Sequence, residues 1–589
     1  MTHWLLDSLT VRRTEALAVA ERIQVQRELG YLEPEPDTAI VLEVAFALEM
    51  VVLDLITEGL PEGDEPLQVL RKTAEDTFRL LRAATLPSEP LMAGSLLLRM
   101  SALAVLGDKG ADAARLLRHR DWPLLPVDSA DWGQRTWASI IDVWLRLILK
   151  KGWEDRDQVL ERIHQLRQTQ ADFEERYLNR LSASYAKSAA LELIGLYHLA
   201  KAAEVLALFI TDGRVDGNYR VDLLLDSHFD RSLAVCANAQ LFELEPLTRL
   251  LAACARQLVE NSIWTVTRSV NSRVTQFVQS LVDHGRGDRA LFDVLPPQRR
   301  TLAEAGLLGS SRRAVVVSLP TSSGKTLIAQ FRILQALNQF DQEQGWVAYL
   351  APTRALVNQL TRQLRRDFAP LGIQVEQVSP ALDLDRFEMN LLGEQSPHLR
   401  FRVLVTTPEK LDLLLRRDWE AKIGRPLTLV VVDEAHNLQS PGRGLKLELL
   451  LSTINKECEK AQFLLLTPFI KNAREVARWL GGRNSGDISL SVDWQPNDRL
   501  VGIAELVAEP KPIGRGYNYQ LELQSVHTSR CTIAIEKPLV MLRSSDHPQS
   551  YSQVSDVGTI AALMARSLSH RGPVIVMHST PAWVWGLAQ

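Results

Sequence analysis

A hydroxyl-rich turn after a short apolar run constrains the fold of this chain more than any other feature. The turn reads Leu319-Pro320-Thr321-Ser322-Ser323-Gly324-Lys325-Thr326 and comes directly after Val315-Val316-Val317. A second apolar run, Leu427 to Val432, ends in Asp433-Glu434-Ala435-His436. A glycine turn between a strand and a helix brings backbone amides close to phosphates, and adjacent carboxylates suit Mg²⁺ and a water. Both motifs favour a parallel α/β sheet.

Each motif offers chemical roles for named residues. Gly324 lets the backbone approach the phosphates, Lys325 supplies charge to the β- and γ-phosphates, and the Thr326 hydroxyl is a magnesium ligand. Asp433 can hold the magnesium, and Glu434 can orient and deprotonate the attacking water. The other candidates are the nucleotide-binding Thr321, Ser322 and Ser323, with His436 as a further catalytic residue. Together they predict ATP and Mg²⁺ as cofactors.

Each motif alone has a simpler interpretation. The first is a serine-rich turn before a helix, because the strict GxxxxGK[ST] pattern begins with glycine where this chain has Leu319. The second is a solvated acidic turn, and a lone histidine such as His436 is more often a surface or core residue. Both motifs in this order, each after an expected strand, favour an ATP hydrolase.

Composition limits the number of domains, the surfaces for nucleic acid and the cellular compartment that can be expected. The chain has 589 residues, enough for about three or four domains. Its 67 basic and 71 acidic residues give a net charge of −4, so any surface for nucleic acid must be local. Four widely spaced cysteines argue against a disulfide framework or a zinc site and favour the cytoplasm. The most apolar stretch, Leu42 to Leu60, contains four acidic residues, so we expect no membrane span.

The pattern of apolar residues divides the chain into four parts. Residues 1–285 are expected to be a large all-α domain, with breaks at Pro87/Pro90 and at Thr211-Asp212-Gly213. Residues 286–485 alternate short strands with helices, and residues 486–555 are a β-leaning linker or insertion. Residues 556–589 open a further α/β domain, in which Pro573 to Met577 are predicted to form a buried strand. The strands expected in 286–485 are 314–318, 347–350, 403–406, 427–432 and 463–466.

Four more motifs carry a family resemblance. They are Leu295-Pro296-Pro297-Gln298, Ala351-Pro352-Thr353-Arg354-Ala355-Leu356, Thr406-Thr407-Pro408-Glu409-Lys410, and Arg443-Gly444 with Glu448-Leu449-Leu450. With the two ATP motifs, their order resembles the Ski-like branch of superfamily 2 DEAD/DEAH-box helicases over about 290–589. The resemblance implies a RecA-like (P-loop) ATPase domain. It also implies that Gln298 contacts adenine, with Phe292 a weaker candidate for stacking.

The resemblance further implies a nucleic-acid track. Thr353, Arg354, Thr407 and Glu409 would contact the backbone of DNA or RNA without reading its sequence. Thr467 stands where the family has an SAT element that couples hydrolysis to strand movement, but the serine position of that element is leucine. No QxxGRxGR-type element is present, so the arginine fingers of a second RecA-like domain are missing. Their loss typically costs about 10³–10⁵ in turnover.

These departures shape the expected function. We expect a nucleic-acid-dependent ATPase that powers translocation or unwinding of DNA or RNA. The second RecA-like domain would be incomplete in this chain, and a partner polypeptide would supply the rest of it. By analogy alone, the helical extension suggests bacterial genome defence against viruses. The alternative is an ATP-binding, nucleic-acid-binding scaffold or switch without helicase activity of its own.

Overall fold

The computed structural model describes most of the chain. The described residues are 3–29, 38–59, 64–118, 132–150, 152–178, 183–217, 220–267, 271–308, 312–377, 401–415, 423–489, 494, 501–513, 516–525, 532–543, 561, 564–566, 568–569 and 573–577. They belong to two compact units, one formed by residues 1–110 with 497–589 and the other by residues 111–496. The domain boundaries proposed from the sequence stay predictions.

The first unit begins with four helices. These are α1 (Trp4–Leu29), α2 (Ala39–Glu58), α3 (Asp64–Ala83) and α4 (Pro90–Leu106). Helix α4 starts where the sequence predicts a break, because Pro90 suits the first helical position and the Glu89 carboxylate accepts a hydrogen bond from the Met92 amide at 3.1 Å. Leu97, Leu98 and Leu103 are fully buried, so α4 is a core helix.

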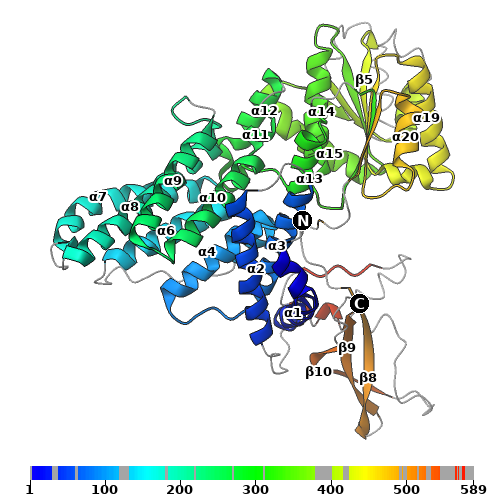
Figure 1. Cartoon of the computed structure of the whole chain (residues 1–589). Coiled ribbons are helices and arrows are strands. Elements are labelled where there is room, and N and C mark those ends of the chain that lie inside the picture. The colour runs from blue at the N-terminus through cyan, green and yellow to red at the C-terminus, as the bar shows by residue number, and fades with distance from the viewer. Residues whose placement is uncertain are drawn as a thin grey trace. The chain divides into compact units, whose positions relative to one another are not determined.

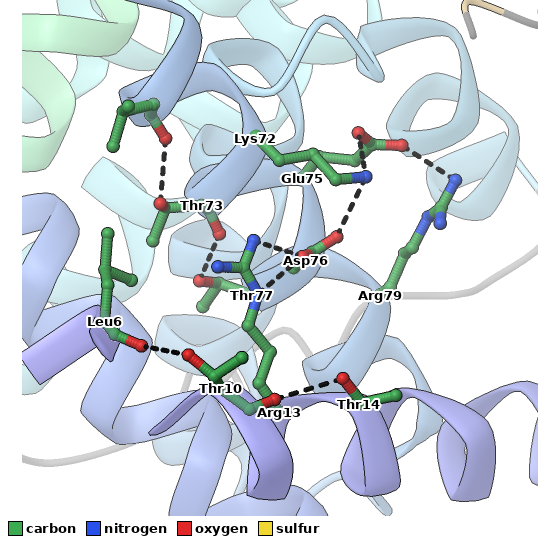
Figure 2. Close-up of polar contacts among 11 residues, drawn as sticks. Leu6, Thr10, Arg13, Thr14, Lys72, Thr73, Glu75, Asp76, Thr77 and Arg79 are labelled. Atoms are coloured by element: carbon green, nitrogen blue, oxygen red, sulfur yellow. Dashed lines mark hydrogen bonds and ion pairs between the residues drawn. The ribbon is translucent and has the colours of Figure 1, made fainter. Parts of the chain in front are cut away.

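Helices α1 and α3 are joined by a buried ion pair (Figure 2). The Asp76 side chain is 2% exposed and accepts hydrogen bonds from Nε and Nη2 of Arg13 at 2.8 and 2.5 Å. Lys72 Nζ lies 3.3 Å from the other Asp76 oxygen and 3.2 Å from Glu75. An acidic side chain this deeply buried needs its cationic partners.

Arg13→Ala should therefore destabilise this unit far more than Arg12→Ala. Removing Arg13 leaves the buried Asp76 carboxylate short of its main partner, a loss worth about 3 kcal/mol. Arg12 pairs with Glu43 across side chains that are 59% and 62% exposed, so its loss should cost less than about 1 kcal/mol. Hydrogen exchange of α3 amides in the full chain measures both. Equal exchange rates in the two variants would contradict the prediction.

The second unit opens with a helical region. Its helices are α5 (Gly110–Arg118), α6 (Trp132–Leu149), α7 (Trp153–Leu178), α8 (Ala183–Asp212), α9 (Val221–Ala239), α10 (Leu244–Asn261), α11 (Ile263–Thr267) and α12 (Ser272–Val282). Helix α8 ends at the predicted break. Its stretch Tyr185–Asp212 is the one described helix apolar and long enough to cross a membrane, and 61% of that apolar window is buried inside the structure. Burial of this kind is typical of a core helix.

A seven-stranded parallel sheet forms the rest of this unit (Figure 1). Its order is β3-β4-β2-β5-β6-β1-β7. The strands are β1 (Ala314–Ser318), β2 (Trp346–Leu350), β3 (Val375–Gln377), β4 (Val403–Thr406), β5 (Leu427–Val432), β6 (Gln462–Thr467) and β7 (Ser485–Ser489). The five predicted strands are confirmed as β1, β2, β4, β5 and β6. They are buried along almost their whole length, which explains their apolar sequences.

Helices cover both faces of the sheet (Figure 1). On one side lie α14 (Lys325–Gln339) and α15 (Arg354–Phe368), and on the other α19 (Arg443–Glu457) and α20 (Ala473–Gly481). Shorter elements are α13 (Pro296–Arg299), α17 (Pro408–Leu415), and the single turns η1 (His284–Arg289), η2 (Arg300–Glu304), η3 (Ala369–Leu371) and η4 (Ala435–Gln439). The large helical region and the RecA-like parallel sheet thus confirm the predicted fold class.

The β-leaning segment is a separate sheet in the first unit. It has three antiparallel strands, β8 (Gly502–Ile513), β9 (Gly516–Ser525) and β10 (Thr532–Arg543), with β9 in the centre. The alternating residues 517–523 lie on β9, as predicted. The predicted buried strand Pro573–Met577 is wrong, because these residues form no strand and Ile575 and Met577 are 82% and 88% exposed. The apolar run alone predicts burial, but burial also requires neighbouring strands.

Candidate nucleotide site

The carboxyl ends of the parallel strands meet at one edge of the sheet. Backbone hydrogen bonds join the loops that leave them. The Leu319 amide donates to the Thr467 carbonyl at 2.9 Å, the Asp433 amide to the Leu350 carbonyl at 2.9 Å, and the Ala351 amide to the Thr406 carbonyl at 3.0 Å. Every motif after a strand is therefore brought to this edge, where parallel α/β sheets bind ligands.

The hydroxyl-rich turn forms a backbone cradle at the start of α14. Ser322 and Gly324 have φ angles of 65° and 73°, in the left-handed region that turns amides toward a common point. A Cβ on Gly324 would lie 2.1 Å from Nε2 of Gln298, and the positive φ would strain any other residue, so glycine is favoured here. Lys325 and Thr326, the first residues of α14, are half-buried. The cradle and the helix N-terminus together suit a phosphate.

The predicted phosphate-loop side chains differ in their exposure. Thr321 and Ser322 are exposed. Ser323 is fully buried, and its hydroxyl donates to the Pro320 carbonyl at 2.8 Å. The Ser323 hydroxyl thus fixes the turn. If Ser323 contacts the nucleotide as predicted, it does so through its backbone amide.

The Asp433 carboxylate is held by two donors. Its Oδ1 accepts from the Glu434 amide at 2.9 Å, and its Oδ2 lies 3.4 Å from the Tyr349 hydroxyl, which donates to it. Burial raises the pKa of Asp433, and the Glu434 charge adds to this, while the Glu434 amide, Lys325 and Tyr349 partly offset it. The influence of Lys325 on this pKa places the two motifs in one electrostatic site.

Glu434 has an unusual backbone. Its φ of 52° and ψ of 48° are left-handed, although it is not a glycine. Its carbonyl accepts from the backbone amide and the side-chain amide of Asn437 at 3.0 and 2.8 Å, which holds the turn in place. His436 Nδ1 lies 3.2 Å from a Glu434 carboxylate oxygen. Strained backbone of this kind clusters at functional sites. The catalytic role of Glu434 stays a prediction.

The donor set fits a magnesium nucleotide. Among the residues that the structure describes, no three histidine, cysteine or acidic side chains gather to hold a metal. A metal here would be held by the Asp433 carboxylate, the Thr326 hydroxyl, water and phosphate. Mg²⁺ is usually bound in this way, with few protein ligands.

Gln298 and Phe292 occupy places other than an open adenine pocket. Gln298 is 4% exposed; its Oε1 accepts from the Leu295 amide at 2.8 Å and its Nε2 donates to the Gly324 carbonyl at 3.1 Å. The adenine contact predicted for Gln298 stays a prediction, and the observed contact is to the cradle. Phe292 is 3% exposed and packs edge-on against Trp153, with ring centroids 6.0 Å apart. The stacking on adenine that was predicted for Phe292 likewise stays a prediction, and the observed contact of its ring is to Trp153.

The residues predicted to contact nucleic acid lie after β2 and β4. Thr353 caps α15 by accepting from the Leu356 amide at 3.3 Å, and both Thr353 and Arg354 are exposed. Thr407 is 8% exposed, and its carbonyl accepts from the Lys410 and Leu411 amides to begin α17. Glu409 Oε1 lies 3.7 Å from Arg443 Nε, which joins two of the family motifs. Thr353 and Arg354 are therefore accessible to a nucleic-acid strand, whereas Thr407 is mostly buried.

Thr467 ends β6 opposite Ser318 of β1 and is fully buried. Its hydroxyl donates to the Phe469 carbonyl at 2.9 Å and accepts from the Phe469 amide at 3.2 Å. In this structure the hydroxyl is therefore engaged with its own turn. Its coupling role stays a prediction.

Three residues near the site are not among those predicted from sequence. Tyr349 is fully buried on β2, and burial with the Asp433 charge raises its pKa well above the ordinary value, so it stays a donor. A tyrosine in the otherwise apolar run 347–350 was the available signal. Asn261 and Arg299, which contact each other beside Gln298, have no comparable signal.

Comparison with known proteins identifies the domain that carries this site. The profile of the DEAD/DEAH box helicase family matches residues 296–476. The ATP-dependent DNA helicase Hel308 of Thermococcus kodakarensis is 33% identical over 220 residues, which cover 37% of this chain and 17% of that protein. The ATP-dependent DNA helicase MER3 of Saccharomyces cerevisiae is 27% identical over 233 residues, covering 38% and 18%.

The sequence similarity covers only part of each relative. The chain spans less than a third of the length of the curated relatives described above. The structure of the DEAD-box helicase Mss116 bound to ssRNA and UDP-BeF is 18% identical, covers 39% of this chain and 45% of that one, and has a TM-score of 0.32. Such a score carries no argument, so the family rests on the sequence matches and the motifs. Residues 296–476 are a DEAD/DEAH box helicase domain, and the motifs in it resemble those of the Ski-like branch.

Proposed function

We propose that this chain is an ATPase whose hydrolysis is stimulated by nucleic acid. It is the motor part of a superfamily 2 helicase that moves along or unwinds DNA or RNA. The observation that carries the proposal is the meeting of two motifs at one sheet edge. The Gly324 cradle and the Asp433–Glu434 pair come from strands far apart in sequence, and the charge of Lys325 reaches Asp433. This arrangement suits phosphoryl transfer to water.

The residues divide the reaction between them. The cradle amides and Lys325 bind the phosphates. Thr326 and Asp433 would hold Mg²⁺, which would supply positive charge beside the phosphates. Glu434 accepts the proton of the attacking water, and His436 beside it orients the carboxylate. Tyr349 keeps Asp433 in place from within the sheet.

The nucleic acid is proposed to pass over the exposed start of α15. Thr353 and Arg354 present a hydroxyl, a guanidinium and a helix N-terminus there, groups that hold phosphates without reading bases. The named relatives are DNA helicases, which makes DNA the first strand to test. A second polypeptide that completes the motor, a cytoplasmic location and a role in genome defence stay predictions from the sequence.

ATP hydrolysis by the full chain, with and without single strands, tests the proposal. We expect turnover to rise on adding oligo(dT) or oligo(rU), and Arg354→Ala to weaken this stimulation. Arg474→Ala on α20, an exposed arginine outside the predicted track, is the matched control. If the chain binds ATP but neither oligonucleotide changes its turnover, the result would favour the alternative, a scaffold or switch that uses its nucleotide site without a motor step.

A further inference from the structure

The segment that leads to Gln298 is bound to the helical region rather than free. Ser262, between α10 and α11, forms an antiparallel bridge with Asp293. The Ile263 amide donates to the Phe292 carbonyl at 3.0 Å, and the Val294 amide donates to the Asn261 carbonyl at 2.9 Å. These bonds join the helical region to the chain immediately before α13.

Side-chain contacts reinforce this bridge. Lys150, at the end of α6, pairs with the Asp293 carboxylate. Arg299 is 3% exposed; its Nη1 donates to the Asn261 side-chain carbonyl, and its Nε donates to Glu304 at 3.1 Å. A buried guanidinium loses much when one acceptor is removed, because few other groups can replace it. Asn261 and Glu304 are therefore two of the groups that hold Arg299 in place.

Gln298 and Arg299 are consecutive residues of the short helix α13 and point to different partners. Arg299 holds Asn261 of the helical region, whereas Gln298 holds the carbonyl of Gly324 in the phosphate cradle. A shift of α13 away from Asn261 would withdraw Gln298 from the cradle. Two neighbouring side chains, Arg299 and Gln298, thus connect the helical region to the phosphate loop.

The helical region also holds the far end of α14, the helix that begins with Lys325. Arg273 of α12 donates to the Leu337 carbonyl at 2.9 Å and pairs with Asp341 at 2.5 Å. Midway along, Phe277 packs edge-on against Phe331 with centroids 5.6 Å apart. Helix α12 therefore supports the middle and the C-terminal end of α14, while Gln298 of α13 holds the turn at its start.

We infer that the helical region positions the ATP cradle, and that Asn261 is the positioning residue that acts through Arg299 and Gln298. The inference rests on the proposed function, because it takes ATP as the ligand of the cradle. The Asn261 side chain accepts from Arg299 and Gln257, and Gln298 lies between this contact and the cradle. It sets how well the cradle is formed before ATP arrives, so its effect falls on ATP affinity rather than on the chemical step.

The test is binding of a fluorescent ATP analogue to the full chain, together with steady-state hydrolysis. Asn261→Ala should raise the Kd and the KM for ATP by about 5- to 150-fold, the usual span of coupling between sites, and leave kcat at saturating ATP nearly unchanged. Asn261→Asp keeps an acceptor for Arg299 and should restore affinity. Gln257→Ala is the control, since Gln257 also donates to Asn261 but does not contact Arg299.

Linkage gives a second readout that needs no variant. If the helical region shapes the cradle, bound nucleotide must in turn stabilise the bridge. The ATP analogue should slow hydrogen exchange at residues 261–263 and 292–294 of the wild-type chain. Unchanged exchange there, or an Asn261→Ala protein that binds the analogue as tightly as wild type, would overturn the inference. A wild-type chain that does not bind the analogue at all would instead overturn the proposed function, and this inference with it.

Discussion

Lys325→Ala should lower ATP turnover by about 10²–10³-fold, the loss expected when one group that stabilises transferring phosphate is removed. Lys325 opens α14 directly after Gly324, where a helix N-terminus and the cradle amides already favour an anion. Its ammonium adds a full charge that reaches as far as Asp433. Because part of this charge already acts on bound ATP before the transition state, the variant should also bind ATP more weakly, with the larger loss in the hydrolysis step.

Single-turnover hydrolysis and analogue binding with the full chain measure these two losses separately. Lys460→Ala is the matched control, because Lys460 precedes β6 and so lies at the opposite edge of the sheet, where it pairs with Glu343 at 2.9 Å. Turnover that persists unchanged in Lys325→Ala would show that the hydrolysis measured does not come from this cradle.

The sheet was predictable where burial dictates sequence. Strands β1, β2, β4, β5 and β6 are short apolar runs because both of their faces are covered by helices. Strands β3 and β7 were missed for the opposite reason. They lie at the two edges of the sheet, and β7 reads Ser-Gly-Asp-Ile-Ser, in which Ile488 alone is apolar. An edge strand is recognised by its neighbours rather than by its own composition.

The site residues, too, divide into those that a local motif marks and those that only the fold brings together. Gly324, Lys325, Asp433 and Glu434 belong to local motifs, so their residue types and spacing are enough to predict them. Tyr349 reaches Asp433 across 84 positions, and Asn261 reaches Arg299 across 38, so no local pattern marks either contact. Ser323 illustrates the limit within a motif, because turn geometry directs its hydroxyl to Pro320 rather than toward ligand.

Glu434→Gln should separate ATP binding from hydrolysis. Glutamine keeps the size of the side chain and the left-handed turn but cannot accept the proton of the attacking water. General-base catalysis typically contributes about 10²–10⁴-fold, and we expect a loss of that size in turnover. Affinity for ATP should stay close to wild type, because the cradle, Lys325 and Asp433 are untouched.

His436→Ala provides a graded comparison. His436 Nδ1 lies 3.2 Å from the Glu434 carboxylate, so its removal leaves the base in place but less well oriented. Its loss in turnover should fall between wild type and Glu434→Gln. Single-turnover hydrolysis and analogue binding give both quantities for each variant. Full turnover in Glu434→Gln would mean that another group activates the water. A parallel loss of ATP affinity would mean that Glu434 shapes the site rather than acting as its base, since a proton acceptor works only once the nucleotide is bound.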